Sequence, residues 1–176
     1  NGVVKKSELT LFSNIMKAGK RAIRLNDEDE VMYIGLTSGT GKDEIFVATR
    51  NGIAIRFSEK DVRSMGTGAT GVKGITLRDK DKIVGAAIIN SEMNNDEMRI
   101  LTITEEGYGK RTKLSEYRFQ SRGGKGIINA KLNEKTGKIV DVKIVKENDE
   151  IMLITSEGTL IRTSVNNISV IGRSAS

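Results

Sequence analysis

The sequence predicts an all-β fold, a propeller-like array of short four-stranded blades. Three observations predict it: a motif that recurs about every 52 residues, glycine turns between β-rich runs, and no convincing helical periodicity. The repeat is carried by aligned turns at 49–52, 104–107 and 155–158. Their glycines follow Gly2 at intervals of 50, 55 and 51 residues. Four strands per repeat are typical of propeller blades.

The strands of each repeat follow from these turns in order. An Asn-Gly or Glu-Gly pair between two apolar runs predicts a hairpin, because glycine tolerates the positive φ of the turn. The strands before the turns are predicted at Glu44–Thr49, Arg99–Thr104 and Glu150–Thr155. Strands after them include Ile53–Phe57 and Thr159–Thr163. Ten positions after each glycine an apolar residue is predicted to enter the core: Phe12, Val62, Tyr117 and Ile168.

A glycine-rich motif, here called the box, supplies the second half of each repeat. Gly71–Ile75 and Gly123–Ile127 align at a spacing of 52 residues, and Gly19–Ile23 lies another 52 residues earlier. A strand-like segment such as Val72–Leu77 follows the box. A last apolar run then predicts a further strand at Val31–Leu36, Ile83–Ile89 and Ile139–Val145.

The repeat frame also predicts the domain organisation. All of residues 1–176 belong to one domain, with repeats at approximately 1–43, 44–98, 99–149 and 150–176, of which the first and last are incomplete. The chain begins at a hairpin turn without its preceding strand and does not begin with Met. We therefore expect a fragment of about three and a half repeats, fewer than a closed ring needs.

Composition excludes several classes of function. The 176 residues contain no His, Cys, Trp or Pro. This rules out thiol nucleophiles, Ser–His pairs and zinc sites, and leaves only carboxylate chemistry possible in principle. The longest apolar run, Ile83–Ile89, is far shorter than the roughly 20 residues of a membrane span, so we expect a cytoplasmic protein. The net charge of +6 favours a polyanionic partner.

Basic residues recur in register with the repeat. One stands four positions after each hairpin glycine, at Lys6, Arg56, Arg111 and Arg162. The boxes add Arg21, Lys73 and Lys125, with further basic residues nearby at Lys17, Lys20, Arg63, Arg118, Arg122 and Arg173. Such charges can be a solvated strand face that blocks edge aggregation. They can equally form a positive stripe along the rim of the array, suited to a long regular polyanion.

The box at 120–126 is the sharpest single motif. Its successive glycines can turn backbone N–H groups outward as an anion-binding nest, or the box can be a plain turn between blades. The G-x-G-x-x-G match at 66–71 is not a dinucleotide fingerprint, because a strand rather than a helix is expected after it. The segment 39–43 lacks the spacing and the Ser or Thr of a P-loop.

The scarcity of aromatic residues and of helices narrows the kind of polyanion that the chain can bind. Aromatic residues make up 4% of the chain, too few for stacking on single strands. No helix with recognition character appears, so reading of the major groove is not expected either. Binding to the phosphates of duplex DNA along a curved surface remains.

Two long stretches resemble a known family. Glu106–Thr112 followed by Tyr117–Ile127 is similar to the C-terminal domain of DNA gyrase A, and so is Asn51–Phe57 running on to Met65–Gly66 and Thr70–Ile75. The likeness covers essentially the whole chain in order. It implies a β-pinwheel, a propeller variant of six blades in which neighbouring blades exchange strands.

The resemblance also implies a function. The family's domain wraps duplex DNA around its basic outer rim with positive handedness, and so supports ATP-dependent negative supercoiling by the A2B2 holoenzyme. Cleavage belongs to the N-terminal part of gyrase A, and ATP hydrolysis belongs to gyrase B. Tyr33, Tyr108 and Tyr117 are therefore not nucleophiles, and this segment is a binding module without cofactor rather than an enzyme. ATP and Mg act in other domains.

The implied contacts are the basic side chains and the box. The DNA-binding residues would be Lys6, Lys20, Arg21, Arg56, Arg63, Lys73, Lys110, Arg111, Arg118, Arg122, Lys125, Arg162 and Arg173. The box turn itself is formed by Gln120, Gly123, Gly124 and Gly126.

The match departs from the family at one point. The family's first-blade box reads Gln-Arg-Arg-Gly-Gly-Lys-Gly, whereas Ser121 stands at its second position here, in the third repeat. This indicates a later blade. Two alternatives stay open: the equivalent domain of topoisomerase IV, and a propeller that binds acidic proteins.

Overall fold

The structure, a computed structural model, describes residues 1–92 and 96–175. It contains eleven strands and four short 3-10 turns, and no α-helix within those residues. The strands are β1 (Val3–Val4), β2 (Glu44–Thr49), β3 (Ile53–Ser58), β4 (Val72–Lys73), β5 (Ile83–Ile89), β6 (Arg99–Thr104), β7 (Gly109–Lys113), β8 (Ile127–Ile128), β9 (Ile139–Val145), β10 (Glu150–Ile154) and β11 (Leu160–Ser164). The 3-10 turns are η1 (Leu9–Phe12), η2 (Glu59–Asp61), η3 (Leu114–Glu116) and η4 (Val165–Asn167).

Three antiparallel hairpins repeat along the chain, as the sequence predicts. They are β2–β3, β6–β7 and β10–β11, and each turn glycine has a positive φ, 87° at Gly52, 77° at Gly107 and 84° at Gly158. The inner strands β5 and β9 pair with β2 and β6. The all-β prediction and most predicted strands are therefore confirmed.

The second repeat forms a complete four-stranded blade in the order β5-β2-β3-β8. Its outer strand β8 comes from the third repeat, so neighbouring repeats exchange a strand. The pair β1–β4 repeats this exchange between the first and second repeats. Strand exchange is the feature that distinguishes a pinwheel from a simple propeller.

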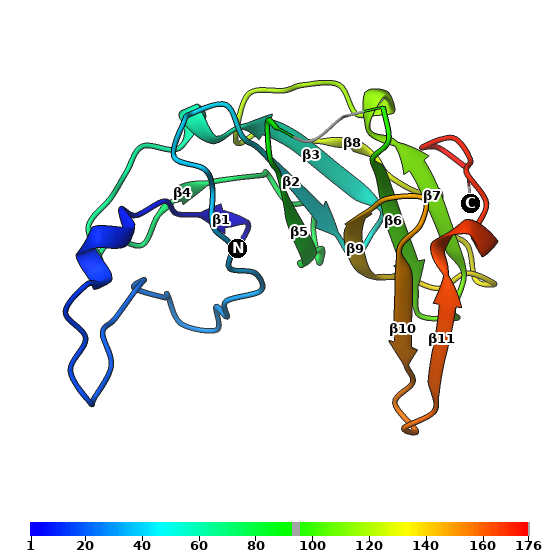
Figure 1. The fold of residues 1–176 in the computed structure, drawn as a ribbon, viewed down its shortest axis with the longest axis horizontal. Coiled ribbons are helices and arrows are strands. Elements are labelled where there is room, and N and C mark those ends of the chain that lie inside the picture. The colour runs from blue at the N-terminus through cyan, green and yellow to red at the C-terminus, as the bar shows by residue number, and fades with distance from the viewer. Residues whose placement is uncertain (93–95, 176) are drawn as a thin grey trace.

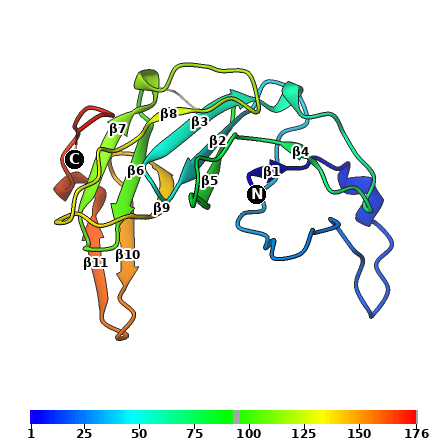
Figure 2. The same ribbon diagram turned by 180° about the vertical axis from the view of Figure 1, so that it is seen from behind.

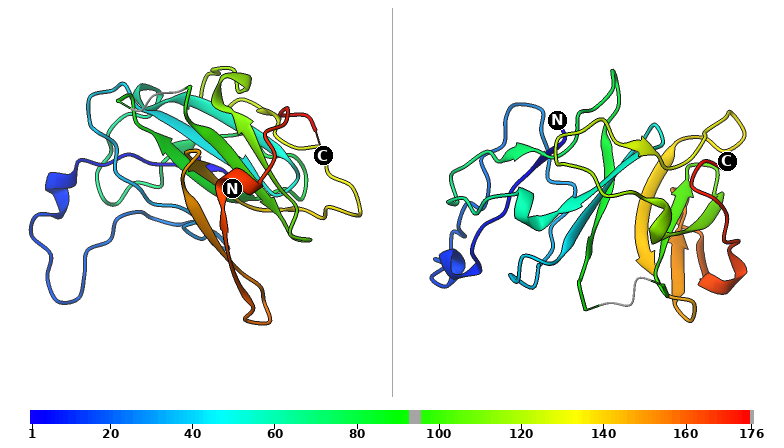
Figure 3. Two further views of the ribbon diagram at one scale, coloured as in Figure 1. Left: turned by 45° about the vertical axis from the view of Figure 1, so that its right-hand side comes forward. Right: turned by 90° about the horizontal axis from the view of Figure 1, so that it is seen from above.

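The sheets stand side by side along an arch (Figures 1 and 2). The inner strands β5 and β9 face its concave side, and η2 and η3 lie on its outer side. The hairpin β10–β11 projects from the other sheets (Figure 3, left). Apolar cores fill the space between consecutive sheets: Phe46 and Tyr117, with ring centroids 4.9 Å apart, belong to one, and Ile55 and Val62 to another. Val62 and Tyr117 are buried as predicted, whereas Phe12 and Ile168 are half-buried.

Two predicted strands are wrong. Val31–Leu36 has no strand structure and is largely exposed, with Ile34 84% accessible. Its register equivalent β5 pairs with β2, but no described strand lies beside 31–36 to accept its hydrogen bonds. The segment Val72–Leu77 shortens to the two residues of β4, because only these two pair with β1.

The predicted box alignment is also wrong, by three residues. The N–H of Gly74 donates to the carbonyl of Gly2 (2.8 Å) just as the N–H of Asn129 donates to Gly52 (2.7 Å), a spacing of 55 rather than 52 residues. Gly71 therefore corresponds to Gly126. A Cβ at either would lie 2.6 Å from a backbone oxygen of the partner strand, which explains the glycine at both positions.

Candidate nucleic-acid interface

Each box turn follows a 3-10 turn, and the turns at 65–71 and 120–126 lead into β4 and β8, which pair with the preceding repeat. The turns span 65–71, 120–126 and 171–175. A two-residue strand, not a helix, follows 66–71, so the residues do not form a dinucleotide site. The box backbone is hydrogen-bonded to the preceding repeat, since the N–H of Gln120 donates to Arg56 (2.9 Å) and that of Gly123 to Gly74 (2.7 Å).

These bonds reduce the predicted anion nest. The N–H of Gly123 is used inside the protein, and the N–H of Arg122 donates to the Asp61 carboxylate (3.4 Å). Among the described residues no partner is found for the N–H groups of Gly124 and Lys125. The N–H groups of Gly124 and Lys125 are therefore available to bind an anion in this box. Gln120 is half-buried, and its Nε2 has no partner within the described residues.

A first set of basic side chains, called the rim cations, is exposed and forms no ion pair with a described residue. Arg63 and Arg118 occupy equivalent positions, 55 residues apart, just before two successive boxes. Lys125 lies in the box itself. The set is Arg21, Arg24, Arg63, Lys73, Arg118 and Lys125. The predicted alignment made Lys73 equivalent to Lys125, but the strand pairing shows that Lys73 corresponds to Ile128.

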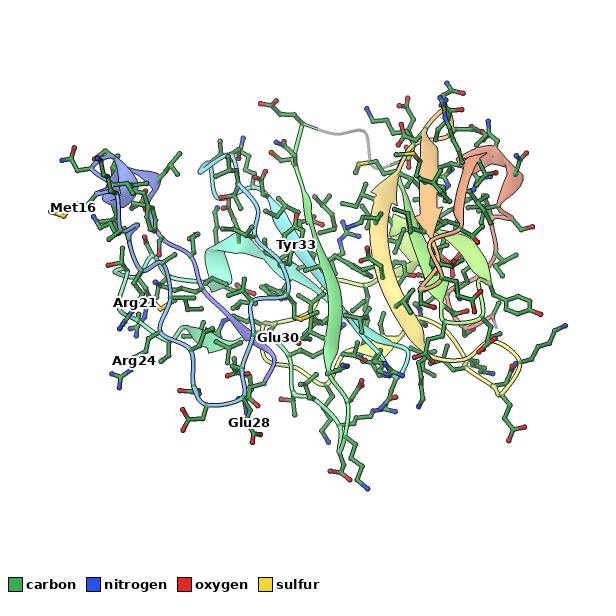
Figure 4. The ribbon with its side chains drawn as sticks, turned by 90° about the horizontal axis from the view of Figure 1, so that it is seen from below. Met16, Arg21, Arg24, Glu28, Glu30 and Tyr33 are labelled. Atoms are coloured by element: carbon green, nitrogen blue, oxygen red, sulfur yellow. The ribbon has the colours of Figure 1, made fainter. Side chains whose placement is uncertain are left out.

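One cavity lies at the second box. It has a volume of about 520 Å³ and is open to solvent, with Arg24 and Arg63 facing the glycine-rich segment from Gly66 to Gly71. The N–H of Arg24 donates to Ala69 (3.1 Å), which brings the first repeat against this box. Figure 4 shows Arg21 and Arg24 at the same edge of the first repeat. Two guanidinium groups beside a glycine turn suit a phosphate group.

Sequence reasoning missed Arg24. It lies outside the box and outside the position four residues after the hairpin glycine, and only the packing of one repeat on the next brings it to the cavity. The equivalent residues in the next two repeats are Thr76 and Lys131, so the position is not basic in every repeat and no regular periodic signal marked it.

A second set, called the seam cations, has its charged groups hydrogen-bonded between repeats. Three of the predicted residues four positions after a hairpin glycine belong to it. The Lys6 ammonium donates to the backbone carbonyl of Glu59 (3.1 Å), the Arg56 guanidinium to that of Leu114 (3.0 Å) and the Arg111 guanidinium to that of Ile168 (2.7 Å). All three carbonyls lie in or beside the 3-10 turn of the next repeat. Arg111 is only 6% exposed.

Arg122 and Arg173 are also seam cations, but they bind the preceding repeat rather than the next one. Each box arginine donates to a strand carbonyl of the preceding repeat, Arg122 to Lys73 (2.5 Å) and Arg173 to Ile128 (2.6 Å). The set is completed by two lysines, so that it comprises Lys5, Lys6, Arg56, Lys110, Arg111, Arg122 and Arg173. The structure thus engages the charged groups of six predicted DNA-binding residues in hydrogen bonds between repeats, and of these Lys110 and Arg111 are buried.

The two remaining predicted residues lie apart from both sets. Arg162 is exposed and pairs with Glu150 on its own hairpin. The Lys20 ammonium donates to the carbonyl of Leu11.

Other kinds of site are not supported by the described part of the chain. There, no group of three or more acidic side chains is placed to hold a metal ion. No described helix is long and apolar enough to cross a membrane.

Exchanged strands and a four-stranded blade, repeated in part by the neighbouring sheets, define a propeller-type repeat domain. A family model described as the DNA gyrase C-terminal domain, beta-propeller, matches residues 1–38, 43–90, 99–146 and 149–176, and the chain belongs to this family. DNA gyrase A of Staphylococcus epidermidis is 44% identical over 99% of the chain, and that of Escherichia coli K12 is 44% identical over 98%.

Solved structures agree. The chain matches a DNA gyrase A C-terminal domain with a TM-score of 0.81 at 30% identity, covering 99% of this chain and 56% of that one. It matches the C-terminal domain of a DNA topoisomerase IV with a TM-score of 0.89 at 29% identity, covering 99% and 53%. The chain spans 19% of the length of the curated relatives. The predicted family and fold are confirmed.

Proposed function

We propose that this chain binds duplex DNA without sequence specificity and bends it along the outer side of the arch. The observation that carries the proposal is the pair Arg63 and Arg118, which are exposed, without ion pairs among the described residues, and equivalent in successive repeats. Lys125 and the available N–H groups of its box lie close in sequence to Arg118. Repeated cations on a convex surface suit the regular phosphates of a duplex.

Bending explains why several repeats are needed. Curving a site of 20–30 base pairs by 40–90° costs on the order of 1–6 kcal/mol. One box cannot offset this, but contacts spread over successive repeats can. In this proposal the segment binds DNA without a cofactor and performs no chemistry. The rest of gyrase A, together with gyrase B, would supply cleavage, ATP hydrolysis and negative supercoiling in the bacterial cytoplasm.

Binding to duplexes of increasing length, at several salt concentrations, tests the proposal. The slope of log K against log salt should steepen with length, because each added repeat engages more phosphates. Relaxation of circular DNA by a topoisomerase in the presence of the chain should leave positive supercoils where wrapping occurs. A flat salt slope, or displacement by acidic polypeptides but not by DNA, would instead favour a module that binds acidic proteins.

The high TM-score to topoisomerase IV makes its C-terminal domain the second candidate. The topological assay separates the two proposals. A gyrase-type domain leaves supercoils of one handedness in the relaxed circle, whereas a domain that only binds the transported duplex leaves none.

A further inference from the structure

Lys110 holds the last box turn from inside the protein. It lies in β7, three residues after the hairpin glycine Gly107, and is 5% exposed. Its ammonium donates to three backbone carbonyls of one turn: Gly172 (3.2 Å), Arg173 (2.8 Å) and Ala175 (2.7 Å). Three donors of one ammonium meet three acceptors of one turn, so the side chain is fully used.

The same arrangement recurs at an earlier junction of the array. Lys5 stands three residues after Gly2, and its ammonium donates to Thr67 (3.1 Å) and to Ala22. Thr67 lies in the second box, as Arg173 lies in the last. A lysine at the same place in two repeats therefore binds the carbonyls of the following box.

The junction between the second and third repeats differs. The equivalent residue there is Ile55, which is 1% exposed and has no donor. A Cβ placed on Gly124 would lie 3.6 Å from the Cδ1 of Ile55, so this box rests on an apolar side chain. Its backbone is instead tied to the preceding repeat, since Thr76 donates through its N–H to Gly124 (2.9 Å) and through its hydroxyl to Gly123 (2.7 Å).

We propose that the lysine three residues after the hairpin glycine is a positioning residue for the phosphate-binding turn of the next repeat. This inference rests on the proposed DNA binding. In the last box the N–H of Arg173 donates to the Glu116 carboxylate (2.7 Å) and that of Ala175 to Gly172 (3.1 Å). With the carbonyls drawn inward, the N–H groups of Gly172 and Ser174, which have no partner among the described residues, remain for a ligand. A phosphate approaching from outside then meets donors rather than acceptors. Without the ammonium, several carbonyls lose their partner and the turn is free to rotate.

The burial of Lys110 makes its charge sensitive to pH in a testable range. Burial lowers the pKa of Lys110 from 10.5 to about 8; the nearby Glu116 acts in the opposite direction and Arg173 in the same one. The ammonium therefore loses its proton near pH 8. A rise from pH 7 to pH 9 should release one carbonyl of the box and leave the guanidinium groups of the rim arginines charged.

The substitution Lys110→Met in the chain removes the ammonium and keeps the length of the side chain. Lys113→Met, an exposed lysine of the same strand, is the matched control. We expect Lys110→Met to weaken duplex binding by about five-fold, to lower the salt slope by roughly 0.9, the value of one phosphate contact, and to raise amide exchange at 172–175. Wild type should lose affinity between pH 7 and pH 9 more than Lys110→Met does.

Three results decide the matter. If wild type binds DNA with a steep salt slope and folded Lys110→Met keeps that slope, its affinity and its pH profile, the positioning role is wrong. If wild type shows no salt-dependent binding, the proposed function itself fails. If Lys110→Met does not fold, Lys5→Met applies the same test to the second box, where amide exchange at 66–71 should rise and an unchanged slope would overturn the inference.

Discussion

The seam cations and the rim cations are the same residue types in the same periodic sequence, yet they lie in different environments. Arg111 is buried, with its guanidinium on backbone carbonyls of the next repeat. Arg118, seven residues later, is exposed and forms no ion pair with any residue in the described ranges. A repeat array must join its units as well as bind a ligand, and a periodic arginine serves the first purpose as readily as the second.

The largest expected effect is at the seam. Arg111→Met leaves the carbonyl of Ile168 and the turn around it without a buried donor, and hydrogen bonds to charged groups contribute about 1.5–3 kcal/mol each. We expect the free energy of unfolding to fall by roughly 2–3 kcal/mol in urea denaturation. Lys113→Met, on the same strand but exposed, should change it by less than about 0.5 kcal/mol. Equal losses in both variants would mean that Arg111 does not join the repeats.

The next effect concerns pH, and it also belongs to the seam. The pKa of Lys110 is about 8 in the folded chain and near 10.5 when unfolded. Between these values the unfolded chain binds more protons, so stability contributed by this residue rises with pH, by at most about 1.4 kcal/mol per unit. Subtracting the unfolding free energies of Lys110→Met from those of wild type between pH 7 and pH 10 isolates this rise. A difference that falls with pH contradicts the assignment.

At the rim, Lys125→Ala should affect DNA and not folding. Lys125 is exposed in its box, so we expect the melting temperature to stay unchanged and the salt slope to fall by roughly 0.9. Isothermal binding at four salt concentrations measures the slope. A lower melting temperature with an unchanged slope would place Lys125 among the structural residues.

The smallest effect is expected at Arg162. It is the register equivalent of Arg111, but it is exposed and pairs only with Glu150 on its own hairpin. Surface ion pairs contribute little, so Arg162→Met should leave unfolding unchanged where Arg111→Met does not. Parallel thermal melts compare the two, and a similar loss in both would remove the distinction between buried and exposed members of the repeat.

The fold was largely predictable because turn glycines and apolar runs are local signals. Glu44–Thr49 and Ile83–Ile89 became β2 and β5 as predicted. Val31–Leu36 has the same apolar character but no described partner strand, and a strand depends on its neighbour's hydrogen bonds. Sequence alone does not show whether that neighbour is in place.

The interface was less predictable, for two physical reasons. The predicted box alignment was wrong by three residues because Lys-Gly-Ile occurs at both 73–75 and 125–127. Only the strand pairing shows that these two tripeptides are not equivalent. The direction of a basic side chain depends on which carbonyls the next repeat presents. Lys110 and Arg63 each recur as a basic residue in one other repeat, as Lys5 and Arg118, but the burial of one and the exposure of the other could be read only from the packed structure.

The central claim is that rim cations, and not seam cations, meet the DNA. The most direct measurement compares the salt slope of Arg63→Ala/Arg118→Ala with that of Lys143→Ala, an exposed lysine of β9 on the inner side of the arch. We predict that the double variant loses roughly 1.8 from the slope, the value of two phosphate contacts, with an unchanged melting temperature, and that Lys143→Ala matches wild type. Equal slopes in all three proteins would contradict the claim.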